Sequence, residues 1–206
     1  MNTIIAAPTT TRPAGPFLNA AFGAAPTVED AAAPMHTVAR RPAGAAMDAA
    51  AQAVYDDAMR GLRGGRLLEA EKALSSLVQQ WPHLASVHAN LGLVYRQMGR
   101  LDAAAGQLDE AVRMSPRNAG YHNQLGLTWR MLGCLDHAQR ALETAIEIDP
   151  THAGALINLA VLHDMQGEPA LAEALYKRSA ALLPGEAAMI NKWLAELKSR
   201  SAQPKP

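Results

Sequence analysis

Two adjoining stretches of the sequence decide the fold. Residues 85–118 read ASVHANLGLVYRQMGRLDAAAGQLDEAVRMSPRN, and residues 119–152 read AGYHNQLGLTWRMLGCLDHAQRALETAIEIDPTH. When the second stretch is written beneath the first, glycines, alanines and prolines fall in the same columns 34 residues apart, as Gly92 and Gly126 illustrate. Similarity at one fixed period is the signature of a repeat protein, in which each unit packs only against its neighbours.

The same step of 34 residues continues on both sides of these stretches. Five columns keep it: Pro82, Pro116, Pro150 and Pro184; Gly65, Gly99, Gly133 and Gly167; Ala70, Ala104, Ala138 and Ala172; Leu74, Leu108, Leu142 and Tyr176; and Ala58, Gly92, Gly126 and Ala160. Chance does not produce five independent columns at one period. They predict four repeats, over residues 51–84, 85–118, 119–152 and 153–186.

Each repeat is predicted to form two helices joined by a tight turn. In the first half of the repeat, core residues recur at i, i+3, i+4 and i+7, which is the pattern of one buried helix face. The glycine after it, for example Gly133, tolerates the positive φ that such a turn requires. A small residue such as Gly126 lets the two helices cross closely. A proline such as Pro150 ends the second helix, because it disfavours helix in the residue before it.

The order of these residues resembles the tetratricopeptide repeat (TPR). The third repeat shows the pattern in full: Leu125, Gly126, Trp129, Gly133, Ala138, Leu142, Ala145 and Pro150. The resemblance covers about residues 51–186. It implies an all-α fold, a right-handed α-solenoid of four TPR helix-turn-helix repeats.

The two ends of the array depart from this pattern. In the first repeat Asp57 and Gly61 stand where a leucine and an aromatic residue are expected. We therefore expect its packing to rest on four other residues: Val54, Tyr55, Ala58 and Leu62. After the fourth repeat, apolar residues return at helical spacing, and they predict a capping helix over residues 187–200.

Residues 1–46 have a different composition. They hold six prolines and show neither a helical nor a strand period. Such a segment cannot bury enough apolar surface to offset its ordering entropy. We interpret it as a disordered Pro/Ala-rich arm. Its apolar patch from Phe17 to Phe22 is interpreted as a loop, with a short helical docking motif as the alternative.

Charge and hydropathy indicate which kinds of partner the protein binds and where in the cell it is found. Lys+Arg and Asp+Glu are both 19, so the chain lacks the basic surface that binding to a phosphate backbone requires. No apolar run is long enough to span a membrane, and the first residues lack the basic start of a signal peptide. These features predict a cytoplasmic protein that neither binds nucleic acid nor inserts into a membrane. Association with the cell envelope through a partner stays open.

No motif for catalysis or for a cofactor is found. The sequence has no Gly-rich phosphate loop, nucleophile elbow or paired zinc motif, so we predict a protein that is not an enzyme and has no cofactor. His88 and His122 occupy equivalent positions in neighbouring repeats. We assign them to packing and not to a metal pair, because no third ligand keeps the same step. Cys134 is the one cysteine in the chain, which excludes an internal disulfide.

The candidate binding site is the second face of the first helices. The TPR resemblance implies that this face lines a concave groove, which in the family holds a peptide or helix from a partner. The groove is predicted to combine a ladder of amides, an aliphatic stripe and a basic row. Its residues are Asn90, Leu93, Arg96, Asn123, Gln124, Leu127, Arg130, Asn158 and Val161.

The function predicted from these features is that of an adaptor or scaffold that binds a partner protein or peptide. The sequence from Lys192 to Lys198 resembles the ends of TPR proteins of pilus or secretion systems, which suggests a role in such an assembly. The alternatives are a structural protein that associates with itself and an accessory subunit of an enzyme complex. The sequence names neither the partner nor the oligomeric state.

Overall fold

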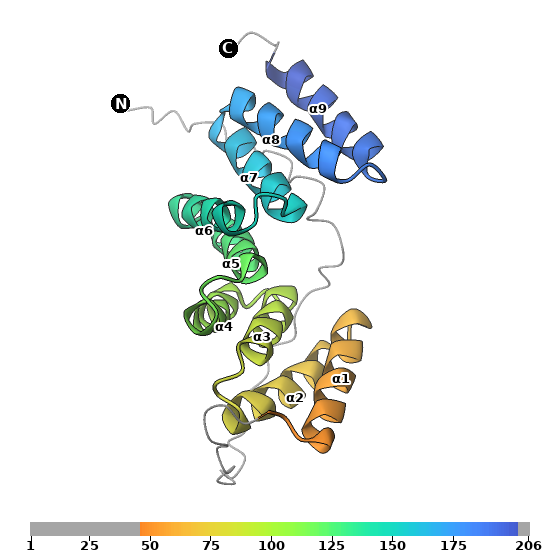
Figure 1. Ribbon diagram of the computed structural model, residues 1–206, viewed down its shortest axis with the longest axis vertical. Helices are drawn as coiled ribbons and strands as arrows, with labels where there is room; N and C mark the ends of the chain where they lie inside the picture. Colours follow the sequence, from red (N-terminus) through yellow and green to blue (C-terminus); the bar gives the residue numbers. More distant parts are fainter. Residues whose placement is uncertain (1–45, 202–206) are drawn as a thin grey trace, which may run out of the picture. The chain divides into compact units, whose positions relative to one another are not determined.

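The computed structural model describes residues 46–201, and within this range it contains nine α-helices and no strand (Figure 1). The predicted arm and its patch from Phe17 to Phe22 lie outside the described residues, except for residue 46. The helices are α1 (Ala49–Arg63), α2 (Leu67–Gln80), α3 (Ala85–Gln97), α4 (Leu101–Met114), α5 (Ala119–Met131), α6 (Leu135–Ile148), α7 (Ala153–Gln166), α8 (Pro169–Leu182) and α9 (Ala187–Ser201). No helix in residues 46–201 has the length and apolar character to cross a membrane.

The helices pack in the order in which they follow one another along the chain. Helices α1 and α2 form one pair, followed by α3 with α4, α5 with α6, and α7 with α8, and each pair packs on the next. Odd-numbered helices up to α7 are the first, or A, helices of the repeats, and the even-numbered ones are the B helices. This neighbour-to-neighbour packing confirms the predicted all-α solenoid.

Glycines and prolines end the helices where the sequence predicted. The four turns between A and B helices each contain a glycine with positive φ: Gly65 (77°), Gly99 (76°), Gly133 (78°) and Gly167 (81°). Side chains other than glycine rarely adopt this backbone conformation, which explains the glycine column. Each B helix ends two residues before a proline, as α6 does at Ile148 before Pro150.

The A and B helices of the middle repeats cross at a glycine. A Cβ atom added to Gly126 would lie 2.7 Å from Cγ of Leu142 and 3.1 Å from the backbone oxygen of Ala138. At Gly92 the corresponding distance to Cγ of Leu108 is 2.8 Å. Real Cβ atoms do not approach other atoms so closely, so the absence of a side chain allows this crossing.

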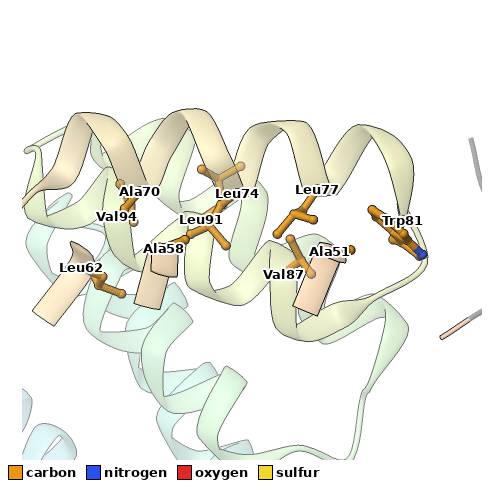
Figure 2. Close-up of a cluster of buried hydrophobic side chains, with 10 residues drawn as sticks. All are labelled: Ala51, Ala58, Leu62, Ala70, Leu74, Leu77, Trp81, Val87, Leu91 and Val94. Carbon is orange, nitrogen blue, oxygen red and sulfur yellow. The ribbon is translucent and has the colours of Figure 1, made fainter. Parts of the chain in front are cut away.

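The first repeat packs as predicted except at one residue. Figure 2 shows its core, in which side chains of α1 meet those of α2 and α3, and Ala58 and Leu62 are buried there as expected. Val54 is 43% exposed, so its assignment to the core was wrong. The buried face of α1 begins at Ala51, and the helical period carries it to Ala58 and Leu62, which leaves Val54 to one side.

Helix α9 covers the last repeat. Its apolar residues are buried against α7 and α8, and they are Ile190, Trp193, Leu194 and Leu197. The ring of Trp193 lies 6.1 Å from that of Tyr176 on α8. The predicted capping helix is therefore present, and it buries an apolar face of the fourth repeat that would otherwise meet water.

Candidate functional site

The candidate site lies on a continuous layer formed by the A helices. Neighbouring A helices touch one another, α1 with α3, α3 with α5 and α5 with α7, whereas within residues 46–201 no two B helices do so to the same extent. The A helices therefore lie on the inner side of the stack of repeats. We call the side chains predicted for the groove the A-helix face: Asn90, Leu93, Arg96, Asn123, Gln124, Leu127, Arg130, Asn158 and Val161. All nine are buried or half-buried, and none is fully exposed.

Two amides of the A-helix face join neighbouring repeats. Nδ2 of Asn90 donates to the hydroxyl of Tyr55 on α1 at 2.5 Å, and Nδ2 of Asn158 donates to Oδ1 of Asn123 on α5 at 2.9 Å. Both bonds link a residue to one 35 positions earlier in the chain. The sequence alone indicated the amide ladder but not its use in holding the repeats together.

The junction between the second and third repeats lacks such an amide bond. Gln124 occupies the position of Asn90 and Asn158, but its counterpart 35 residues earlier is Ala89, which has no side-chain acceptor. In addition, Oε1 of Gln124, itself an acceptor, is buried without a hydrogen-bond donor. The backbone oxygen of Gln124 instead accepts from Nη1 of Arg96 at 3.3 Å.

Arg96 and Arg130 are enclosed on this face without a carboxylate. Arg130 is only 7% exposed, and its Nη1 contacts Sδ of Met165 at 3.8 Å, which is a weak acceptor. Its Nε is buried and has no hydrogen-bond partner. Among the described residues, no carboxylate lies within ion-pairing distance of either guanidinium, whereas the exposed Arg60 and Arg100 both have one.

Burial shifts the pKa of both guanidinium groups, and the charge of Arg130 also acts on Arg96. Burial, together with the charge of Arg130, lowers the pKa of Arg96 to about 10. Burial also lowers the pKa of Arg130, and the neighbouring Tyr176 opposes that shift. Arginine side chains are charged at neutral pH, so this face holds two positive charges that are partly removed from water.

Aliphatic side chains lie between the amides and the arginines. On α3 the order is Asn90, Leu93 and Arg96, and the same spacing of three residues returns on α5 from Gln124 to Arg130. Leu93 and Leu127 are half-buried. The face therefore offers an amide edge, an apolar strip and a positive edge within reach of one bound segment.

The position held by Arg96 and Arg130 has an acidic residue in the fourth repeat. Asp164 stands where Arg96 and Arg130 stand in the repeats before it, and its Oδ2 accepts from Nη2 of Arg200 at 2.6 Å. The first repeat has Leu62 at this position, so among the four repeats only the second and third have an arginine there.

His88 and His122 have structural roles. Nε2 of His88 lies 3.2 Å from the oxygen of Pro82, and Nε2 of His122 lies 2.9 Å from the oxygen of Pro116, so each contacts the loop that leads into its own helix. Residues 46–201 contain no group of three His, Cys, Asp or Glu side chains that could hold a metal ion.

A shallow depression lies away from the A-helix face. It is lined by the loop and first turn at residues 115–120, together with Ile148, Asp149 and His152. The sequence did not suggest this hollow, because it arises where two successive loops between repeats lie side by side. It brings together no residues with an evident joint chemistry.

The stacked helix pairs define an α-solenoid repeat protein. Two family models, both described as tetratricopeptide repeat, match the chain, one over residues 55–120 and 89–138 and the other over residues 133–196. Together the matches run without a gap from residue 55 to residue 196. The chain belongs to the tetratricopeptide repeat family, as its sequence pattern indicated.

Solved structures share this fold. MamA from Desulfovibrio magneticus RS-1 matches with a TM-score of 0.66 at 18% identity, over 76% of this chain and 88% of that one. TTC0263, a thermophilic TPR protein in Thermus thermophilus, matches with a TM-score of 0.63 at 26% identity, over 71% and 80% of the two chains. The first TPR of Spaghetti (RPAP3), bound to the HSP90 peptide SRMEEVD, matches with a TM-score of 0.55 at 16% identity, over 57% and 93%. No curated protein matches the sequence.

Proposed function

We propose that this chain is a non-catalytic adaptor that binds a segment of a partner protein on its A-helix face. The observation that carries the proposal is the enclosed row of amides, leucines and unpaired arginines along α3 and α5. Each kind of side chain suits a different part of a polypeptide: amides suit the backbone, leucines suit apolar side chains, and guanidinium groups suit acids. Neither arginine has a counterion among the described residues, and taking charge out of water without one is costly, which argues against a role in stability alone.

A structural neighbour supports a peptide as the ligand. The first TPR of Spaghetti was solved with a peptide that contains acidic residues, SRMEEVD. Its identity to this chain is 16%, so the likeness carries the fold and not the binding residues. It supports only the general proposal that TPR helices of this kind hold a segment of a partner, and not the choice of binding residues.

Photo-crosslinking in the native cell tests the proposal. A benzophenone amino acid is placed at Leu127 on the A-helix face, and in a matched variant at Leu68, which is 63% exposed on α2. We expect one protein to be crosslinked from Leu127 and not from Leu68. That protein, once purified, should bind the wild-type chain, and Leu127→Asp should weaken its binding about tenfold or more, because a buried carboxylate beside apolar groups is costly.

Other results would favour other functions. Crosslinks from Leu68 but not from Leu127 would move the site to the B-helix side and contradict the proposal. Crosslinks between two copies of this chain would favour the self-associating structural protein. A role in pilus or secretion-system assembly remains a prediction, because it rests on the sequence from Lys192 to Lys198 alone.

A further inference from the structure

We propose that Arg96 and Arg130 together bind one acidic side chain, aspartate or glutamate, from within the partner segment. This inference rests on the proposed function and names the chemistry of its ligand. It concerns one point on the A-helix face, the ends of α3 and α5 in the two middle repeats.

The first argument is the missing counterion. A charge that is taken out of water normally has an opposite charge or several hydrogen bonds to offset its desolvation. Arg130 is 7% exposed and has one contact with a thioether sulfur and one buried N–H without a partner. Arg96 has one hydrogen bond, to a backbone oxygen. Both groups can therefore gain from a carboxylate, and a shared carboxylate offsets the repulsion between them.

The second argument is that the contacts of Arg130 can be exchanged easily. Met165 is 39% exposed and has an unbranched, flexible side chain. A carboxylate oxygen is a far stronger acceptor for a guanidinium N–H than a thioether sulfur. A bound acid can therefore replace the sulfur next to Arg130 without a change in the helices.

The third argument concerns the source of the carboxylate. The A-helix face continues beyond the arginine pair in both directions, toward Tyr55 on α1 and toward Val161 on α7. A segment that lies along this face passes the pair and does not end there. This placement favours an internal acidic side chain over the carboxylate at the end of a chain.

The fourth argument is the confinement of positive charge. Asp164 replaces the arginine in the fourth repeat and is already bound to Arg200. Within the described residues, the row therefore offers one place for an acid and not a series of places. We expect a single acidic position in the ligand, with apolar residues beside it for Leu93 and Leu127.

Selection from a random peptide library tests the proposal with the full-length chain. The library displays peptides with blocked ends, and a second library displays peptides with free carboxyl ends. We expect the wild-type chain to enrich Asp or Glu at one internal position, and the double variant Arg96→Gln, Arg130→Gln to lose that enrichment. Arg63→Gln is the matched control, because Arg63 is an exposed arginine on α1, and it should keep the enrichment.

The affinities of selected peptides give the size of the effect. Replacing the enriched Glu by Gln should weaken binding to the wild-type chain about tenfold to a hundredfold, since a hydrogen bond to a charged group is lost. The same replacement should change binding to the double variant less than about threefold. The double variant should also unfold close to the wild-type temperature, because the hydrogen bond lost between Arg96 and Gln124 is offset by the removal of two enclosed charges that lack a carboxylate. A clear fall in melting temperature would show that the arginines serve the fold, which overturns the proposal.

The remaining outcomes separate this inference from the proposed function. Peptides that depend on Leu127 but show no acidic preference would overturn the inference and leave the adaptor proposal standing. Enrichment only from the library with free carboxyl ends would mean that the site binds the carboxylate at the end of a chain, which overturns the inference of an internal acid. Failure to select any peptide that depends on Leu127 would overturn both.

Discussion

One position of the A helix has a positive side chain in the middle of the array and a negative one in the last repeat. In the second and third repeats it holds Arg96 and Arg130, which are enclosed and lack a carboxylate among the described residues. In the fourth repeat it holds Asp164, which is bound to Arg200 of the capping helix at 2.6 Å. At this position the charged side chain has an ion-pair partner within the chain in the fourth repeat, and it has none among the described residues in the second and third repeats.

This difference suggests that the charged residue stabilises the array in the fourth repeat, whereas the arginines of the middle repeats are available for a ligand. The last repeat has only one neighbouring repeat, so the cap supplies its missing contacts, apolar ones through Trp193 and ionic ones through Arg200 and Lys198. The middle repeats have neighbours on both sides; Arg96 donates one hydrogen bond across their junction, and neither Arg96 nor Arg130 has a carboxylate partner among the described residues. Three pairs of variants test this contrast, from the largest expected effect to the smallest.

The largest effect is expected at the helix crossing of the third repeat. Gly126→Leu should lower the free energy of unfolding by about 3 kcal/mol, because its side chain would enter space already filled by Leu142. In the fourth repeat the same column holds Ala160, so that crossing already accommodates a Cβ atom. Urea unfolding followed by circular dichroism measures the change.

Gly106→Ala is the control for this substitution. Gly106 lies within α4, and an added Cβ would meet no atom within 4 Å. This variant should be more stable than the wild type by roughly 0.5–1 kcal/mol, since glycine weakens a helix interior. If Gly126→Leu unfolded at the wild-type urea concentration, the close crossing of α5 and α6 would be wrong.

The next effect concerns the amide bonds between repeats. Asn158→Ala removes the hydrogen bond to Asn123 and should cost about 1 kcal/mol of stability. Gln124→Ala changes the equivalent side chain at the middle junction, where Oε1 has no partner, and should leave stability unchanged or slightly raised. Equal losses in the two variants would contradict the difference between these junctions.

The smallest effect is expected at the ion pair of the last repeat. Asp164→Arg extends the basic row and places two arginines together, so we expect a loss of about 0.5–1 kcal/mol, because the pair is partly exposed and screened. Adding Arg200→Asp restores opposite charges and should recover most of that loss. A double variant no more stable than the single one would show that Asp164 and Arg200 do not stabilise each other.

Much of the fold followed from the sequence because each column has a local cause. The positive φ at Gly133 and the close crossing at Gly126 can be predicted from the residue alone. The error at Val54 arose because the pattern of the first repeat is degenerate. The buried face of α1 begins at Ala51, which lies before Ala58, the first residue of α1 in one of the five columns.

The candidate site was only partly predictable. The sequence places its residues on one helix face, since helical spacing determines that. It does not say that Asn90 is bound to Tyr55, or that Arg130 is more enclosed than Arg63, because those facts depend on how tightly one repeat lies on the next. The pairing of Asp164 with Arg200 spans 36 residues and needed the position of the capping helix.

The absent amide bond between the second and third repeats has a mechanical consequence. In a linear array, stiffness depends on each junction separately, and the most compliant junction takes most of a bend. Here the polar link at that junction is the bond from Arg96 to the backbone of Gln124, made by a side chain that we also propose to bind the ligand. We expect the array without a ligand to bend at this junction, between two stiffer halves. A bound segment that contacts both halves should reduce this bending.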